Sequence, residues 1–233
     1  RTYDDNIVRF TKEISENREE LITWKYFQYL SLLFTEVYLD KYFSNKAKLL
    51  AELNQFVKEF NFKQADPSNL RGKKKKDVFI AQPFTLSALN KLAFWNATGS
   101  GKTLIMHVNI KQYLHYTRKY NLHHQNKVLL ITPNEGLSKQ HLEEFRLSDI
   151  QANIFNKDAS KMFSGKEVEI LEITKLADVS GDKRVAVDSF ETDNLVLIDE
   201  GHGGMGGEKW KPFRDQLSET GFAFEYSATF GQA

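Results

Sequence analysis

The segment LAFWNATGSGKT, residues 92–103, decides the fold of this 233-residue chain. Its first four residues are apolar and predict a short strand, and residues 102–120 predict a helix. A glycine-containing loop between a strand and a helix points several backbone N–H groups inward, and the positive end of the helix adds to them. Glycine also lets the backbone fold around an anion with no side chain in the way. The segment therefore predicts a phosphate-binding loop.

The residue order in this loop is that of a P-loop, with the core TGSGKT intact and Asn96 in place of the usual first glycine. The alternative is a glycine–serine loop that happens to precede a lysine, and the strand–loop–helix context argues against it. We predict that Lys102 reaches the β- and γ-phosphates of ATP and that the Thr103 hydroxyl binds Mg²⁺. The predicted ATP-binding residues are Thr98, Gly99, Ser100, Gly101, Lys102 and Thr103.

The segment LVLIDEGH, residues 195–202, carries the second chemical signal. Its four apolar residues predict a buried strand that ends in Asp199 and Glu200. Ligands of open α/β sheets bind at the carboxyl ends of the strands. We therefore predict that Asp199 holds Mg²⁺, directly or through water, and that Glu200 polarises the attacking water as a general base.

Short apolar segments alternate with helical ones from residue 78 onward, which indicates a mostly parallel sheet covered by helices on both faces. The predicted fold class is α/β. The predicted strands are residues 92–95, 128–132, 150–155, 168–173, 195–198 and 222–226, and the predicted helices are 102–120 and 137–145.

Residues 1–77 predict a helical lobe that ends in a basic linker, and residues 78–233 form the second predicted domain. A helix is expected over Glu19–Phe43, with Ser44 as the N-cap of the next helix. The basic run Arg71–Lys76 is interpreted as a solvated loop, with contact to phosphates as the alternative. The apolar stripe expected on the first helix is Leu21, Trp24, Phe27, Leu30, Leu33, Phe34 and Val37.

Composition excludes several classes of protein. The chain has no cysteine, which excludes disulfides, thiolate chemistry and cysteine zinc sites. We find no apolar run long enough for a membrane span and no signal peptide, so we expect a cytoplasmic protein with no membrane partner. Because the first residue is Arg1, we expect an excerpt of a longer protein. His123, His124 and His141 show no metal-ligand spacing and are predicted to be surface residues.

Three motifs occur in a familiar order: the P-loop, Asp199-Glu200-Gly201-His202 and Ser227-Ala228-Thr229. With them the chain resembles superfamily 2 helicases that carry a DExH-type second motif, over about residues 78–233. It looks most similar to the motor subunits of type I and type III restriction enzymes and to related bacterial defence helicases. The resemblance implies that residues 78–233 form the first RecA-like motor domain.

The same resemblance implies further functional residues. Pro133 to Gln140 is similar to motif Ia, which touches the nucleic-acid backbone. It keeps Pro133, Leu137 and Gln140 of that motif, with Glu135 and Gly136 in place of its arginine and glutamate. His202 is expected to couple nucleotide to nucleic acid. Gln82 lies roughly where an adenine-reading glutamine can sit. The third motif, which links hydrolysis to movement along nucleic acid, is Ser227, Ala228 and Thr229.

The function implied is an ATP-dependent DNA helicase or translocase of a restriction or phage-defence system, with ATP and Mg²⁺ as cofactors. DNA is favoured over RNA as the nucleic-acid partner. A second RecA-like domain is expected in the full-length protein, with nuclease or methyltransferase subunits as further partners. Since the second domain normally supplies arginine fingers, we expect the isolated chain to hydrolyse ATP slowly or not at all.

Three alternatives remain open at this point: an RNA helicase, a nucleotide-gated binding module that does not translocate, and a P-loop kinase of small molecules. The catalytic base predicted at Glu200 argues against a pure binding module. The third motif and the DEGH sequence argue against a kinase.

Overall fold

The computed structural model describes residues 2–65, 79–122, 125–155, 167–177, 185–200 and 207–228. The chain forms two compact units, one made of Arg1–Leu39 with Asn90–Ala233 and the other of Asp40–Leu89. Several predictions concern residues outside the described ranges: those for Arg71–Lys76, His123, His124, His202 and Thr229, and the domain boundary at residue 77.

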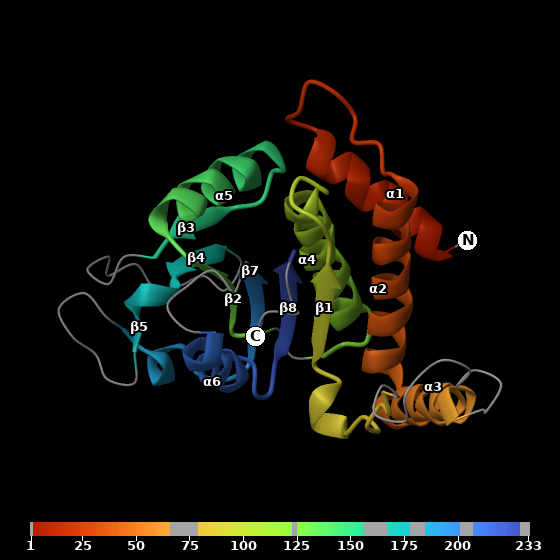
Figure 1. The fold of residues 1–233 in the computed structure, drawn as a ribbon. Coiled ribbons are helices and arrows are strands. Elements are labelled where there is room, and N and C mark those ends of the chain that lie inside the picture. The colour runs from red at the N-terminus through yellow and green to blue at the C-terminus, as the bar shows by residue number, and fades with distance from the viewer. Residues whose placement is uncertain are drawn as a thin grey trace. The chain divides into compact units, whose positions relative to one another are not determined.

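The larger unit is built around a six-stranded sheet in which every strand pair is parallel, in the order β1-β8-β7-β2-β4-β3 (Figure 1). This arrangement confirms the predicted α/β class with a RecA-like P-loop domain. Leu176–Ala177 (β5) and Val185–Ala186 (β6) form a separate parallel pair. The strands of the large sheet are β1 (Lys91–Trp95), β2 (Lys127–Thr132), β3 (Ala152–Ile154), β4 (Val168–Glu172), β7 (Asn194–Asp199) and β8 (Phe222–Ser227).

Helices lie between these strands along the chain and before the first of them. No helix in the described ranges is both long enough and apolar enough to cross a membrane. The helices of the larger unit are α1 (Thr2–Ser15), α2 (Tyr26–Ser44) as far as Leu39, α4 (Lys102–Lys119), α5 (Glu135–Leu147) and α6 (Gly207–Leu217), with the 3-10 turns η4 (Ile173–Lys175) and η5 (Val187–Phe190).

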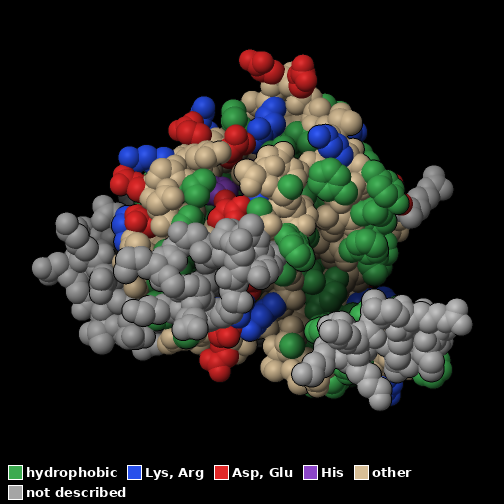
Figure 2. Space-filling view, viewed as in Figure 1, with side chains coloured by type: hydrophobic (Ala, Val, Ile, Leu, Met, Phe, Trp, Pro, Cys, Tyr) green, Lys and Arg blue, Asp and Glu red, His purple; other side chains and the backbone are tan. Residues whose placement is uncertain are grey.

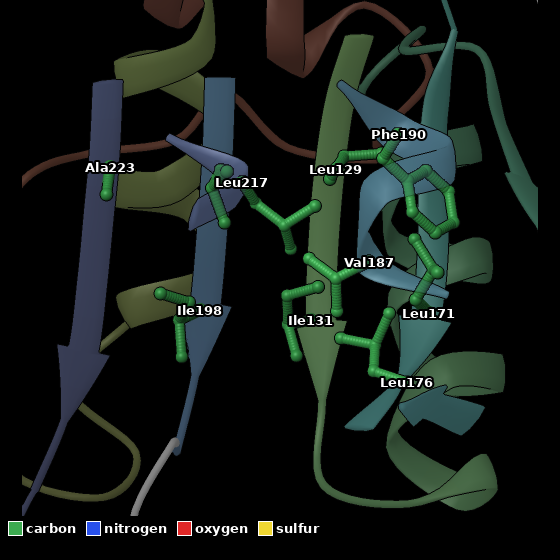
Figure 3. Packing of buried hydrophobic residues seen from close by; sticks show 10 residues of the cluster. Leu129, Ile131, Leu171, Leu176, Val187, Phe190, Ile198, Leu217 and Ala223 are labelled. Atoms are coloured by element: carbon green, nitrogen blue, oxygen red, sulfur yellow. The ribbon is translucent and has the colours of Figure 1, made fainter. Parts of the chain in front are cut away.

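One face of the sheet packs against α6 and η5. Successive residues of a strand point to opposite faces, so Val196 and Ile198 of β7 lie on the same face as their register partners in β2, Leu129 and Ile131. Leu217 of α6 packs onto this layer. Figure 3 shows the cluster, to which η5 contributes Val187 and Phe190.

The opposite face packs against α4. The ring centroids of Tyr113 and Phe222 are 5.7 Å apart, and Phe94 stacks on Tyr226 at 4.9 Å. The Asn109 amide of α4 donates to the Tyr226 hydroxyl at 2.8 Å. Burial raises the pKa of Tyr226 well above its ordinary value, and the hydrogen bond from Asn109 only partly opposes this. Helices therefore cover both faces, which explains why the strands are continuous apolar runs.

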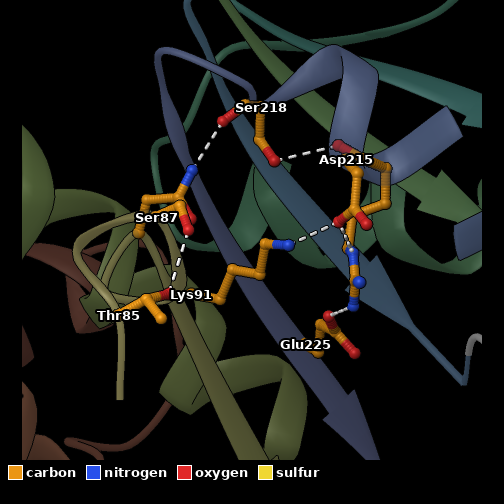
Figure 4. Close-up of polar contacts among 8 residues, drawn as sticks. Thr85, Ser87, Lys91, Asp215, Ser218 and Glu225 are labelled. Carbon is orange, nitrogen blue, oxygen red and sulfur yellow. Dashed lines mark hydrogen bonds and ion pairs between the residues drawn. The ribbon is translucent and has the colours of Figure 1, made fainter. Parts of the chain in front are cut away.

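A chain of charged side chains ties the edge of the sheet to α6 (Figure 4). Lys91 Nζ of β1 lies 2.5 Å from Asp215 Oδ1, which also accepts from Arg214 Nε at 2.8 Å. Arg214 pairs in turn with Glu225 of β8. Burial alone would lower the pKa of Arg214, but Asp215 and Glu225 outweigh it and raise that pKa. Because these groups satisfy one another, α6 is held against β8 beside the edge strand.

The structure corrects the prediction for the first N-terminal helix. Residues 21–25 lie outside any helix, and α2 begins at Tyr26 rather than at Glu19. The predicted apolar stripe is not the buried face, because Leu21, Phe27 and Phe34 are 63%, 44% and 67% exposed. Figure 2 shows green hydrophobic side chains at the surface in the region where Figure 1 draws α2. The buried face of α2 in this unit consists of Gln28, Leu32, Thr35, Glu36 and Leu39.

The apolar residues of α2 occur on all sides of the helix, so their spacing does not predict which face is buried. Polar contacts determine the buried face. The Glu36 carboxylate is fully buried, and its Oε2 accepts from the Tyr116 hydroxyl of α4 at 2.6 Å and from the Asn6 amide of α1 at 2.9 Å. Since an unpaired buried carboxylate is costly, this one fixes how three helices pack together.

The smaller unit contains α3 (Lys46–Ala65) and the 3-10 turn η3 (Leu86–Ala88). Asn54 and Asn61 are two helical turns apart on α3 and each holds the backbone of the returning chain. Asn54 accepts from Phe84 N at 2.7 Å and donates to Phe84 O at 3.1 Å. Asn61 makes the same pair of bonds with Ala81, both at 2.9 Å.

The N-cap prediction for α3 was wrong by one residue. Ser44 is the last residue of α2, and its hydroxyl donates back to Lys41 O at 3.3 Å. The neighbouring Asn45 supplies the cap, because its Oδ1 accepts from Lys48 N at 2.9 Å. Both residue types favour this position, so local sequence alone does not choose between them.

Glu36→Gln is expected to change how stability depends on pH. Burial raises the pKa of Glu36 although hydrogen bonds from Tyr116 and Asn6 oppose the shift. The folded state thus favours the protonated carboxyl. The stabilisation that Glu36 provides is fully present at pH values below its unfolded-state pKa of about 4.3. It is lost as the pH rises through the raised pKa of the folded state.

The glutamine variant keeps the shape of Glu36 and cannot ionise. Its free energy of unfolding relative to the native chain should therefore increase with pH above about 4.3. Urea unfolding of both proteins across a pH series measures this difference. Parallel pH profiles of the two proteins would contradict the interpretation.

Candidate active site

The residues with predicted chemical roles lie together along one edge of the sheet, the edge that is formed by strand ends. Because all six strands are parallel, their carboxyl ends share that edge. The loop 96–101 follows β1, Asp199 ends β7 and Ser227 ends β8, which lies between these two strands. The topology therefore brings together three segments that are far apart in the sequence.

The P-loop residues adopt the backbone that their glycines allow. Gly99 and Gly101 have φ angles of 72° and 82°, in the left-handed region that favours glycine, and α4 begins directly afterwards at Lys102. The Lys102 side chain is only 10% exposed, and its Nζ lies 2.8 Å from Glu200 Oε1 and 3.3 Å from Asn96 O. The two predicted catalytic groups, a lysine and a carboxylate, are thus in direct contact.

Glu200 also connects to the third predicted motif. Its backbone N–H donates to Tyr226 O at 2.9 Å, and its Oε2 accepts from Ala228 N at 3.5 Å. Its φ angle of 51° is left-handed, a conformation that costs a residue with a side chain about 1 kcal/mol. With this backbone conformation, the Glu200 carboxylate lies against the P-loop lysine. Glu200 therefore bridges Lys102 and the end of β8.

The ends of β1 and β8 are joined by two further bonds. Asn96 N donates to Ser227 O at 3.1 Å, and the indole N–H of Trp95 donates to Ala228 O at 2.8 Å. The P-loop and the segment 227–228 are therefore hydrogen-bonded to each other, so a movement of either segment would displace the other.

His141 is the main correction to the predicted site. It was predicted to be a surface residue, but it is 2% exposed, and its Nε2 lies 2.8 Å from Asp199 Oδ2. Ser138, His141 and Phe145 are the buried residues of α5, at intervals of three and four. That helical spacing in the sequence could have identified His141 as facing the sheet.

Gln28 is a second residue that sequence reasoning missed. Its Nε2 donates to Ser100 O at 2.7 Å, and its Oε1 accepts from Lys25 N at 2.7 Å. A Cβ added to Gly101 would come within 2.5 Å of this Nε2, so the glutamine lies directly against the P-loop. Gln28 precedes the loop by 72 residues, and no local pattern marks it.

Other predicted residues are placed less centrally. Gln82 is exposed and belongs to the smaller unit. Pro133 is half-buried just after β2, and Gln140 is exposed on α5. Asn134, between them, caps α5 by accepting from Leu137 N at 3.0 Å. The motif Ia-like segment is thus the end of a strand and the first turns of a helix.

The residues at the site fit a nucleotide phosphate. Two buried polar atoms of the loop, Ser100 Oγ and Asn96 Nδ2, have no hydrogen-bond partner within the described ranges. Phosphate oxygens are acceptors of the kind that such groups need. No group of three or more His, Asp or Glu side chains in the described part of the chain could hold a metal ion alone. A Mg²⁺ ion here would instead combine Asp199 and Thr103 with phosphate and water oxygens, the usual arrangement for this ion.

A phosphate loop on an edge strand, facing an acidic pair at the end of a buried parallel strand, defines a RecA-like P-loop domain. The particular family follows from comparison with known families. The model of the type III restriction enzyme, res subunit, matches residues 48–232, and the chain belongs to this family. It is therefore a superfamily 2 helicase-like domain, an ATP-dependent motor domain of the restriction-enzyme type. No curated protein matches the chain.

Proposed function

We propose that this chain is the first motor domain of an ATP-dependent DNA helicase or translocase in a restriction or phage-defence system. The observation that carries the proposal is the 2.8 Å contact between Lys102 and Glu200, with Ala228 N on the second carboxylate oxygen. It joins the P-loop, the DExH-type second motif and the third motif in one contact network. The same motif style supports a similarity to type I as well as type III motor subunits.

In this proposal the loop 98–103 binds the phosphates of ATP, and Lys102 leaves Glu200 to contact the β- and γ-phosphates. Glu200 is then free to accept a proton from the water whose oxygen bonds to the γ-phosphorus, while the bond to the β-phosphate oxygen breaks. Thr103 and Asp199 hold Mg²⁺, which neutralises phosphate charge when bound. Ser227, Ala228 and Thr229, together with His202, couple the nucleotide state to nucleic acid.

The remaining assignments complete the proposal. Pro133 and Gln140 contact the nucleic-acid backbone, and Gln82 contacts adenine. A second RecA-like domain of the full-length protein closes over ATP, and nuclease or methyltransferase subunits use the motor. The predicted helical lobe, residues 1–77, serves as a docking surface for another domain or subunit.

The test is nucleic-acid-stimulated ATP hydrolysis by the full-length protein that contains this chain. DNA is expected to stimulate hydrolysis more than RNA of the same sequence and length. Stimulation by RNA alone would instead identify an RNA helicase. If neither nucleic acid stimulates hydrolysis, the motor proposal fails and a nucleotide-gated binding module takes its place.

Gln28→Ala is expected to weaken nucleotide binding by about 3- to 10-fold, the worth of about one hydrogen bond. The variant loses the Gln28 side-chain amide, which donates to Ser100 O and occupies the space next to Gly101 in the native chain. A titration of the full-length protein with fluorescent ATP measures the affinity.

Gln112→Ala is the matched control, because this buried glutamine of α4 also donates to a backbone carbonyl, that of Leu32, at 3.0 Å. It should lower stability and leave the affinity unchanged. Equal losses of affinity in the two variants would show that Gln28 acts through stability alone.

A further inference from the structure

The contact between His141 and Asp199 lies in a buried layer between α5 and β7. The side chains are 3% and 9% exposed, and Nε2 and Oδ2 are 2.8 Å apart. His141 directly follows Gln140, so it belongs to the helix that carries the motif Ia-like segment. Asp199 is the carboxylate assigned above to the divalent cation. The contact thus connects two parts of the site that the motifs alone leave separate.

We propose that His141 is a positioning residue: it orients the Asp199 carboxylate for the divalent cation and ties that orientation to α5. This inference rests on the proposed function, because it needs Asp199 to be a metal ligand. It assigns to the chain a cation-orienting residue outside the three motifs.

The chemistry of the two side chains supports this role. An ionised carboxylate can only accept hydrogen bonds, so Nε2 of His141 carries the hydrogen and donates to Oδ2. This hydrogen bond restricts rotation of the carboxylate and leaves its other oxygen available to a cation. Groups that hold a metal ligand from behind typically change metal affinity about 10- to 100-fold when they are removed.

Packing fixes the imidazole in place. The ring centroids of His141 and Phe145 are 6.2 Å apart, and the Phe145 ring stacks on the ring of His107 with a centroid distance of 4.5 Å. His107 is held in turn by Ser148 Oγ at 2.8 Å. Burial lowers the pKa of His107 well below its ordinary value, so this end of the stack is uncharged. Because His141 is buried beside this stack, its side chain can hold another group in a fixed direction.

The helix that carries His141 also gives the contact a second consequence. Asn134 caps α5 directly after Pro133, and Thr132 Oγ1 at the end of β2 lies 2.7 Å from Ser138 Oγ. The first turn of α5 is therefore fixed to the strand end. A displacement of the segment Pro133–Gln140 by nucleic acid would therefore change or break the contact between His141 and Asp199.

The experiment compares His141→Ala with His141→Gln in the full-length protein. The glutamine side-chain amide can place an N–H near the position of Nε2, whereas alanine cannot. Binding of fluorescent ATP is measured in EDTA and at increasing Mg²⁺, and ATP hydrolysis is measured over the same Mg²⁺ range. We expect His141→Ala to need at least about 10-fold more Mg²⁺ in both assays, with unchanged binding in EDTA, and His141→Gln to recover most of the loss.

His107→Ala is the matched control, because it removes a buried imidazole from the same Phe145 stack without touching Asp199. It should lower stability and leave the Mg²⁺ requirement unchanged. An unchanged Mg²⁺ requirement in folded His141→Ala, or an equal increase in His107→Ala, would overturn the inference. The binding assay does not depend on hydrolysis, so it tests the role of His141 separately from the motor proposal. If the native protein binds Mg²⁺-ATP but nucleic acid does not stimulate hydrolysis, the motor proposal fails, and the Mg²⁺ dependence of binding still decides the role of His141.

Discussion

Lys102→Ala is expected to reduce ATP hydrolysis by about 10²- to 10³-fold and to weaken nucleotide binding as well. A preorganised cation aimed at charge that develops during the reaction contributes several kcal/mol, and Lys102 is a buried cation at this edge of the sheet. Its ammonium group already lies among oxygen atoms, 2.8 Å from Glu200 Oε1 and 3.3 Å from Asn96 O. The same surroundings orient the ammonium group to donate to phosphate oxygens. Nucleic-acid-stimulated ATPase of the full-length protein gives the rate, and a fluorescent-ATP titration gives the affinity.

Lys111→Ala is the control for this substitution. Lys111 lies on the same helix and also forms an ion pair, with Glu13 Oε2 at 2.9 Å, but on the side of α1. Its removal should leave hydrolysis close to the native rate. If the Lys102→Ala protein keeps the native rate and affinity, the assignment of the P-loop as the ATP-binding site is wrong.

Glu200→Gln is expected to lower the rate of hydrolysis by about 10²- to 10⁴-fold, the usual contribution of a general base, while nucleotide binding persists. Glutamine retains an oxygen that can accept from Lys102, but it cannot take a proton from water. The left-handed backbone at this position should accommodate either side chain equally, because they have the same branching. The variant thus separates binding from chemistry.

Glu225→Gln serves as the comparison. Glu225 is also a partly buried carboxylate on the same sheet, but it faces α6 and pairs with Arg214. We expect its loss to lower stability without a comparable effect on the rate. If Glu200→Gln hydrolyses ATP at the native rate while Glu225→Gln does not, the assignment of the base is wrong.

The sheet could be predicted from sequence because its strands are buried on both faces. A segment such as Leu195–Ile198 has to be apolar at every position, and such a run between loops has few other interpretations. The carboxyl-end rule then placed Lys102 and Glu200 near each other without any coordinates. The structure supports that placement with a 2.8 Å contact.

What sequence could not predict depends on partners far away along the chain. The buried face of α2 was missed because aromatic and aliphatic residues occur all around it, and the contacts of Glu36 with Tyr116 and Asn6 decide the face. Gln28 lies against the P-loop only because of that packing. His141 is a different case: its spacing with Ser138 and Phe145 indicated the buried face, but it was missed because the histidine side chain is intermediate between surface and core types.

The place of β1 in the sheet has a consequence for how the domain is synthesised. Within the described ranges β1 pairs with β8 alone, so Lys91–Trp95 pairs with Phe222–Ser227, a segment far away along the chain. Pairings between segments so distant in sequence form late, because the intervening loop must close first. On the ribosome, the P-loop would remain without the strand that supports it until β8 has emerged. We therefore expect ATP binding to appear only after Phe222–Ser227 has been synthesised.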